Sequence, residues 1–139
     1  MSKVAVIYWS GTGNTEAMAG AVAEGAKAAG AEAALLTCAD VTGVSDYDAV
    51  ALGCPAMGAE ELEDSEFLPM LEGIEPALPG KKVALFGSYG WGDGEWMRTW
   101  EARCAEKGIT LAAASVLANE APDDDALAAC KALGVELTK

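Results

Sequence analysis

The most constraining feature of this chain is the junction between its first expected strand and its first expected helix. An apolar run over residues 3–9 indicates a strand, a helical pattern begins at Thr15, and small residues join the two. Backbone N–H groups at a helix start lack partners and carry partial positive charge, so this position favours an anion. Gly11 and Gly13 allow a tight turn around it. The side chains that add donors are Ser10, Thr12, Asn14 and Thr15.

The same junction excludes two common nucleotide-binding loops. It has no Lys or Arg, whereas a P-loop needs a lysine after its second glycine, and its glycines lack the G-x-G-x-x-G spacing of a dinucleotide fingerprint. A loop of neutral donors suits one terminal phosphomonoester that is held as an anchor. The simpler interpretation, a helix cap rich in Ser and Thr that binds no ligand, stays open.

Charge and composition limit the partners. The 139 residues carry a formal net charge of −13, which argues against nucleic acid, because phosphate backbones need basic patches. An apolar fraction of 52% is enough for the core of a single domain over residues 1–139. We find neither a signal-peptide pattern nor a run near the roughly 20 apolar residues that span a bilayer. We therefore expect a cytoplasmic protein without membrane insertion.

The cysteines and the absence of histidine exclude several kinds of site. Cys38, Cys54, Cys104 and Cys130 form no C-x-x-C pair, so zinc and iron–sulfur sites are not expected, and the thiols should be free and buried. A chain with no histidine lacks the commonest general base, which argues against Ser-His and Cys-His hydrolases.

Short apolar runs alternate with helical patterns along the chain, which predicts an α/β fold with a parallel sheet covered on both faces. Strands are expected at residues 3–9, 31–37, 49–54, 82–88 and 110–118, helices at 15–29, 65–74, 95–107 and 123–133, and an irregular helical turn within 38–47. Candidate N-caps are Ser65 and Asp123, and candidate helix ends are Gly30, Gly108 and Gly134. Pro69 should make its helix start late or bend.

Ligands of such sheets sit beyond the carboxyl ends of the strands, so the loops at 10–15, 55–64 and 89–94 should converge. Trp91 stands among glycines and can lie flat against a planar group, and Met57 offers a polarizable side chain for the opposite face. Together with the phosphate anchor, they indicate a pocket for a planar ring on a phosphorylated tail. Trp91 as a lid over the core and Met57 as a gap filler stay open as alternatives.

In order and spacing, the three loops resemble those of the short-chain flavodoxins. The resemblance rests on Ser10-Gly11-Thr12-Gly13-Asn14-Thr15-Glu16, on Pro55-Ala56-Met57-Gly58 followed by Glu60-Glu61, and on Gly87-Ser88-Tyr89-Gly90-Trp91-Gly92-Asp93-Gly94. It implies a flavodoxin-like three-layer sandwich whose five-stranded parallel sheet has the order 2-1-3-4-5. It also implies non-covalently bound FMN and one-electron transfer between redox proteins.

The resemblance further implies a role for each loop. The FMN phosphate would lie on Ser10, Thr12, Gly13, Asn14 and Thr15, and the ring between Met57 and Trp91. Glu60 would face N(3), the backbone of residues 88–91 would serve the carbonyl and N(1) side, and Gly58 would turn its carbonyl toward N(5) on reduction. The full expected binding set is Ser10, Gly11, Thr12, Gly13, Asn14, Thr15, Ala56, Met57, Gly58, Ala59, Glu60, Ser88, Tyr89, Gly90, Trp91, Gly92 and Gly94, with Asn119 as a candidate at the ribityl chain.

Two further expectations concern the redox potentials. Acidic residues near the flavin loops should penalise the anionic reduced flavin and give a low potential. They are Glu60, Glu61, Glu63, Asp64, Asp93 and Glu95. Ala59 stands where many relatives have an acidic or polar residue. Because alanine resists the left-handed backbone that a flipped Gly58–Ala59 peptide needs, it should weaken stabilisation of the semiquinone.

Three classes of function follow. The first is an electron carrier without a substrate of its own, a monomer that cycles between semiquinone and hydroquinone and docks on basic faces of reductases or ferredoxin-dependent enzymes. The second is an FMN-dependent NAD(P)H:quinone oxidoreductase, for which we find no spare segment to build a second pocket. The third is a receiver-like signalling domain, which is disfavoured because the first and third strands end in Trp9-Ser10 and Cys54-Pro55 rather than in acidic residues.

Overall fold

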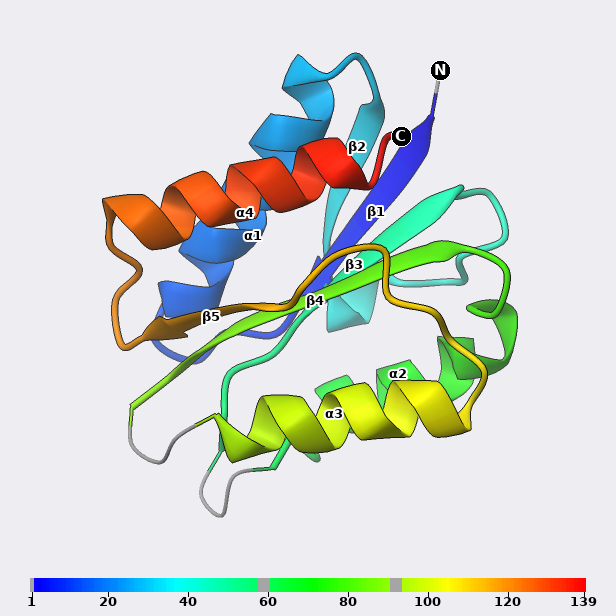
Figure 1. Ribbon diagram of the computed structural model, residues 1–139. Coiled ribbons are helices and arrows are strands. Elements are labelled where there is room, and N and C mark those ends of the chain that lie inside the picture. Colours follow the sequence, from blue (N-terminus) through cyan, green and yellow to red (C-terminus); the bar gives the residue numbers. More distant parts are fainter. Residues whose placement is uncertain (1, 58–60, 91–93) are drawn as a thin grey trace.

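Five parallel strands form one sheet between two pairs of helices (Figure 1). The computed structural model describes residues 2–57, 61–90 and 94–139. The strands are β1 (Lys3–Tyr8), β2 (Glu32–Thr37), β3 (Ala49–Gly53), β4 (Lys82–Tyr89) and β5 (Val116–Asn119). The helices are α1 (Asn14–Ala28), α2 (Phe67–Ile74), α3 (Glu95–Glu106) and α4 (Asp124–Glu136), with short 3₁₀ segments η1 (Cys38–Asp40) and η2 (Glu75–Ala77). The strand order β2-β1-β3-β4-β5 confirms the predicted fold.

The last strand is shorter than expected. Of the predicted strand over residues 110–118, only the part from Val116 onward pairs with β4. Upstream, Leu111 makes one isolated bridge to Val83, after which the chain leaves the sheet. The apolar run at 110–115 is therefore a connection along the edge of the sheet rather than strand. No helical segment forms over Val41, Val44 and Tyr47, the expected position of the irregular helical turn; the short helical segment of this connection is η1, which comes just before these residues.

Two of the predicted helix signals are wrong, one because of packing between helices and the other because of a neighbouring carboxylate. Gly134 does not end a helix but lies inside α4, where an added Cβ would overlap the carbonyl oxygen of Val22 in α1. Ser65 does not cap α2, because the buried carboxylate of Glu63 accepts hydrogen bonds from three backbone N–H groups at that helix start. Both residues fit a helix boundary by local rules. Gly134 instead allows α4 to pack against α1, and Glu63 takes the place of Ser65 as the cap of α2.

The other helix signals are confirmed. The Asp123 side chain accepts a hydrogen bond from Ala126 N at 2.8 Å, and Gly30 and Gly108 follow their helices with φ of 94° and 75°. Because α2 begins at Phe67, Pro69 falls in its first turn, where a missing N–H costs no helical hydrogen bond. That helix does start later than the apolar pattern suggests.

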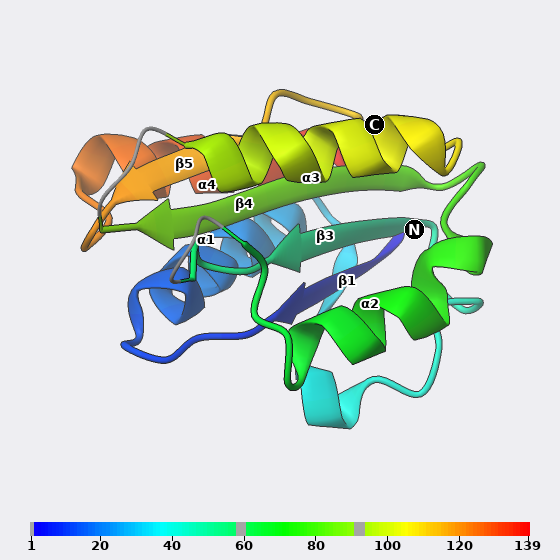
Figure 2. The same cartoon turned by 90° about the horizontal axis from the view of Figure 1, so that it is seen from below.

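Each face of the sheet has its own core. Helices α1 and α4 cover one face and α2 and α3 the other (Figures 1 and 2). Three cysteines are buried free thiols, as expected, whereas Cys38 is half-buried. In the described part of the chain, we find no helix both long and apolar enough to cross a membrane.

The strand registers bring the carboxyl ends together. Tyr8 at the end of β1 is level with Gly53 at the end of β3, and Gly53 is level with Phe86. Strand β4 then continues to Tyr89, which pairs with Asn119 of β5. In Figure 2 the arrowheads of β1, β3, β4 and β5 point to the same side of the molecule. The loops after these strands are therefore neighbours.

Candidate functional site

The loops after β1, β3 and β4 line one cavity of about 410 Å³ at the carboxyl edge of the sheet. Eight of its lining residues belong to the expected binding set: Gly11, Thr12, Asn14, Ala56, Met57, Ser88, Tyr89 and Gly90. Trp9, Pro55 and Glu120 also line it, although the sequence did not single them out. The structure thus brings all three loops to the same space.

The remaining residues of the expected set do not line this cavity or are not described. Ser10, Gly13, Thr15 and Gly94 are not among its lining residues. Gly58, Ala59, Glu60, Trp91 and Gly92 lie outside the described residues. Stacking by Trp91, the Gly58 peptide flip and the effect of Ala59 consequently stay predictions.

Ser10 organises the first loop from behind. Its Oγ accepts hydrogen bonds from the backbone N–H of Gly13 at 3.0 Å and of Glu16 at 3.3 Å, so it acts as a cap for the start of α1. The proton of this hydroxyl remains available to a ligand. Gly13 precedes the helix with φ of 94°, a left-handed conformation that a side chain would strain. The first turn of α1 opens next to Thr12 and Asn14 at the cavity wall.

A buried hydroxyl pair links the first loop to the third. Thr15 Oγ1 and Ser88 Oγ lie 3.2 Å apart, with 1% and 4% of these residues exposed. Since one hydroxyl must donate to the other, the pair ties the start of α1 to the end of β4. Thr15 therefore supports the site from inside the protein, a contact between residues 73 apart that no sequence pattern signals.

Two backbone hydrogen bonds close the neck of the second loop. Met57 N donates to Glu61 O at 2.9 Å and Glu61 N donates to Met57 O at 3.1 Å. Just before the neck, Ala56 N donates to Ser88 O at 3.0 Å, which fixes this loop against β4. Met57 is thus held at the cavity wall by backbone contacts on both sides.

Behind this loop lies a set of buried groups around Cys54. Burial raises the pKa of the Cys54 thiol to about 12, so it stays neutral, and its sulfur accepts from Glu63 N at 3.4 Å. Burial also pushes the pKa of the Glu63 carboxyl upward, but hydrogen bonds from the N–H groups of Phe67, Glu66 and Ser65 prevail and hold it below its ordinary value. The negative charge of Glu63 therefore stabilises the start of α2.

Two aromatic residues brace the third loop. Trp96 Nε1 donates to Cys54 O at 3.1 Å, and the Tyr89 and Trp96 ring centroids are 5.5 Å apart. Tyr89 O accepts from the N–H of Glu120, a non-glycine residue with φ of 58°. That left-handed turn brings Glu120 to the cavity, whereas Asn119 lines a separate hollow between β5 and α4. Because Glu120 directly follows β5, the strand-end rule applied one residue further on would have selected it.

The acidic residues near the loops are not equivalent. Glu95 pairs with Arg98 at 2.7 Å, and Glu63 is occupied at the start of α2. Glu61 and Asp64 are exposed, and Glu120 lines the cavity. Glu60 and Asp93 lie outside the described residues. Among the described residues, Glu120 is the acidic residue that lines the cavity, and Glu61 is its neighbour through backbone hydrogen bonds to Met57.

The sequence and the fold are both similar to known flavodoxins. The family model described as Flavodoxin matches residues 6–134. The chain is 49% identical over 138 residues to a flavodoxin of Megasphaera elsdenii, with 98% of each covered, and 46% identical over 121 residues to one of Clostridium beijerinckii, with 86% and 88% covered. The solution structure of two-electron reduced Megasphaera elsdenii flavodoxin has a TM-score of 0.86 at 49% identity, with 96% of this chain and 97% of that one covered.

Proposed function

The chain belongs to the flavodoxin family, which binds FMN and transfers electrons, and from that premise we propose that it is a low-potential carrier of single electrons. In this proposal it works between the semiquinone and hydroquinone forms of FMN and has no substrate of its own. The observation that carries it is the single cavity lined by all three loops. Bound FMN supplies the redox chemistry, and the protein supplies its binding, position and electrostatic surroundings.

The described residues fit the phosphate of FMN. The start of α1 presents neutral hydroxyl and amide donors and no basic side chain, which suits an anchored phosphomonoester. We propose Ser10, Thr12, Gly13, Asn14 and Thr15 as the phosphate ligands. Two contacts support this assignment: Ser10 caps the start of α1, and Thr15 is hydrogen-bonded to Ser88. Both hold the phosphate loop in place without a bound ligand.

The rest of the cavity fits the ring and its polar edge. We propose that Met57 and Trp91 cover opposite faces of the isoalloxazine and that Glu60 faces the N(3) edge of the ring. Backbone groups of residues 88–91 would serve the carbonyl and N(1) side. Met57, Tyr89 and Gly90 all line the same cavity, which supports this arrangement.

Negative charge near the ring supports the low potential. A carboxylate about 10 Å from the ring raises the energy of an added electron by about 1.7 kcal/mol at an effective dielectric constant near 20, or about 70 mV for one electron. Glu120, which lines the cavity, is placed to exert this effect. The same acidic surface would attract basic faces of reductases or ferredoxin-dependent enzymes, and we expect the carrier to be a cytoplasmic monomer.

Stepwise dithionite reduction of the FMN-loaded protein tests the proposal. We expect the visible spectrum to pass through a stable blue intermediate before it bleaches. Direct bleaching in one two-electron step, together with steady NAD(P)H oxidation in the presence of a quinone, would instead favour the oxidoreductase alternative.

A further inference from the structure

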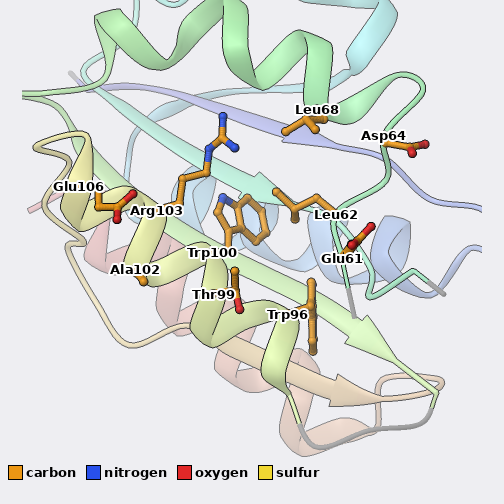
Figure 3. Close-up of a pocket in the computed structure, with 10 residues that line it drawn as sticks. All are labelled: Glu61, Leu62, Asp64, Leu68, Trp96, Thr99, Trp100, Ala102, Arg103 and Glu106. Atoms are coloured by element: carbon orange, nitrogen blue, oxygen red, sulfur yellow. The ribbon is translucent and has the colours of Figure 1, made fainter. Parts of the chain in front are cut away.

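A second cavity, of about 550 Å³, lies between α2 and α3 (Figure 3). Among the described residues, it shares no lining residue with the cavity of the three loops. In Figure 3 the indole of Trp100 extends from α3 into the space between the two helices, with Leu62 and Leu68 on the opposite side. Neither the expected binding set nor the proposed function uses this space.

Trp100 supplies a buried donor that lacks an acceptor. Only 1% of the residue is exposed, and within the described chain its Nε1 has no hydrogen-bond partner. Trp96, one helical turn earlier on the same face of α3, donates its own Nε1 to Cys54 O at 3.1 Å. Buried polar groups are almost always hydrogen-bonded, because an unmet donor destabilises the fold. The indole N–H of Trp100 is therefore an unsatisfied donor that a bound molecule with an acceptor oxygen could satisfy.

The cavity walls define what kind of molecule could bring that acceptor. Leu62 and Leu68, both partly buried, offer apolar contact. The guanidinium of Arg103, which also lines the cavity, is held by both carboxylate oxygens of Glu75 at 2.6 and 2.7 Å, so its charge is already balanced. An apolar body suits these walls better than an anion does.

The rim carries the opposite chemistry. Glu61, Asp64 and Glu106 all line the cavity and are exposed. In Figure 3 Glu61 and Asp64 lie at the end near Leu62, whereas Glu106 lies at the other end, beyond Arg103. Two carboxylates at one end of an apolar hollow favour a cationic group there. The combination is a flat apolar body, an acceptor facing Trp100 and a positive charge at the rim.

We propose that this cavity binds a small arylalkylamine whose ring carries a hydroxyl or carbonyl oxygen. The ring lies among Leu62, Leu68 and the two indoles, and its oxygen accepts from Trp100 Nε1. The ammonium group lies beside Glu61 and Asp64 at one end of the cavity. Because the nitrogen is covered in this structure, binding requires a small movement of the cavity wall.

Three probe compounds test the two halves of this proposal on the full FMN-loaded chain. Tyramine has both the oxygen and the amine, phenethylamine lacks the oxygen, and 3-(4-hydroxyphenyl)propionate replaces the cation by an anion. In ¹⁵N-resolved NMR spectra we expect tyramine to move the indole N–H signal of Trp100, identified by its loss in Trp100→Phe. Tyramine should bind roughly three- to tenfold more tightly than phenethylamine, and the propionate more weakly than either amine.

Matched variants separate the donor from the charge. Trp100→Phe keeps an aromatic ring and should abolish the preference for tyramine over phenethylamine. Asp64→Asn should weaken both amines by roughly two- to fivefold, and Glu24→Gln, an exposed site on α1 across the sheet, should change neither. An indole signal that none of the probes moves, or equal binding of tyramine and phenethylamine, would overturn the proposal and leave water as the partner of Trp100.

Discussion

The two faces of the sheet are packed by opposite means. Between the sheet and α1 with α4, half of the buried core residues are alanine, and Gly25 and Gly134 bring the two helix backbones into direct contact. Between the sheet and α2 with α3, the core contains Phe67, Trp96 and Trp100, and a cavity of about 550 Å³ remains. Small residues allow the helices to pack closely. Each buried indole, by contrast, has an N–H group that needs a hydrogen-bond acceptor.

This difference matches the parts of the site that each face supports. The alanine-rich face holds α1, whose first turn is proposed to bind the phosphate. The aromatic face holds the two ring loops through Glu63, Trp96 and Cys54, which connect α2 and α3 to the end of β3. We therefore expect substitutions on the alanine-rich face to destabilise the protein by disturbing helix packing. Substitutions on the aromatic face should destabilise it by removing polar contacts.

The largest effect is expected from Arg103→Met on the aromatic face. The change leaves the Glu75 carboxylate, 6% exposed, without its bidentate partner, and breaking such a pair costs about 3 kcal/mol or more. Urea unfolding measures the free energy of unfolding. Arg103→Lys keeps the charge and should recover part of the loss. Equal stability of the wild type and Arg103→Met would show that this contact does not hold η2 against α3.

On the alanine-rich face, Gly25→Ala should cost about 2 kcal/mol. The added Cβ would overlap the carbonyl oxygen of Lys131 in α4, so the two helices must separate. Gly20→Ala is the matched control in the same helix, because outside its chain neighbours and the nearby backbone of α1 no described atom lies within 4 Å of its Cβ position. This control should raise stability by about 0.5–1 kcal/mol through helix propensity. Similar effects of both changes would contradict the close packing.

Glu63→Gln tests the polar contacts at the start of α2. We expect a loss of about 1 kcal/mol at pH 7, since a neutral amide is a weaker acceptor for the three N–H groups. Because the pKa of Glu63 is lowered in the folded protein, its contribution is complete above its ordinary pKa and disappears as the pH falls through the lowered value. The difference between wild type and variant should therefore shrink below about pH 4. Exposed Glu66, changed to Gln, should show no such convergence.

Thr15→Val should have a smaller effect on stability and a clear effect on FMN. It preserves shape but removes a hydroxyl from the pair with Ser88, so the start of α1 loses its tie to β4. We expect FMN affinity, measured by quenching of flavin fluorescence, to fall about tenfold. Ser115→Ala removes a hydroxyl that donates to Glu101 instead, and it should leave FMN affinity unchanged.

Local patterns predict the order of the elements and the meeting of the loops, because apolar runs and glycine positions act over short distances. They fail most clearly where a distant residue decides. Gly134 fits a helix end but lies where α4 packs against the backbone of α1, and the unmet donor of Trp100 depends on what stands opposite it. Neither feature has a signature in neighbouring residues. The expected cap Ser65 and the missed cavity residue Glu120 are different, because the carboxylate that replaces Ser65 is Glu63, two residues away, and Glu120 directly follows β5.

The most direct test of the central claim compares FMN with riboflavin, which has the same ring but no phosphate. If the neutral donors at the start of α1 anchor the phosphate, FMN should bind at least about 100-fold more tightly, equivalent to about 2.7 kcal/mol. Titration with fluorescence quenching gives both dissociation constants. Equal affinity for the two flavins would contradict the account, because the first loop would then contribute nothing to binding.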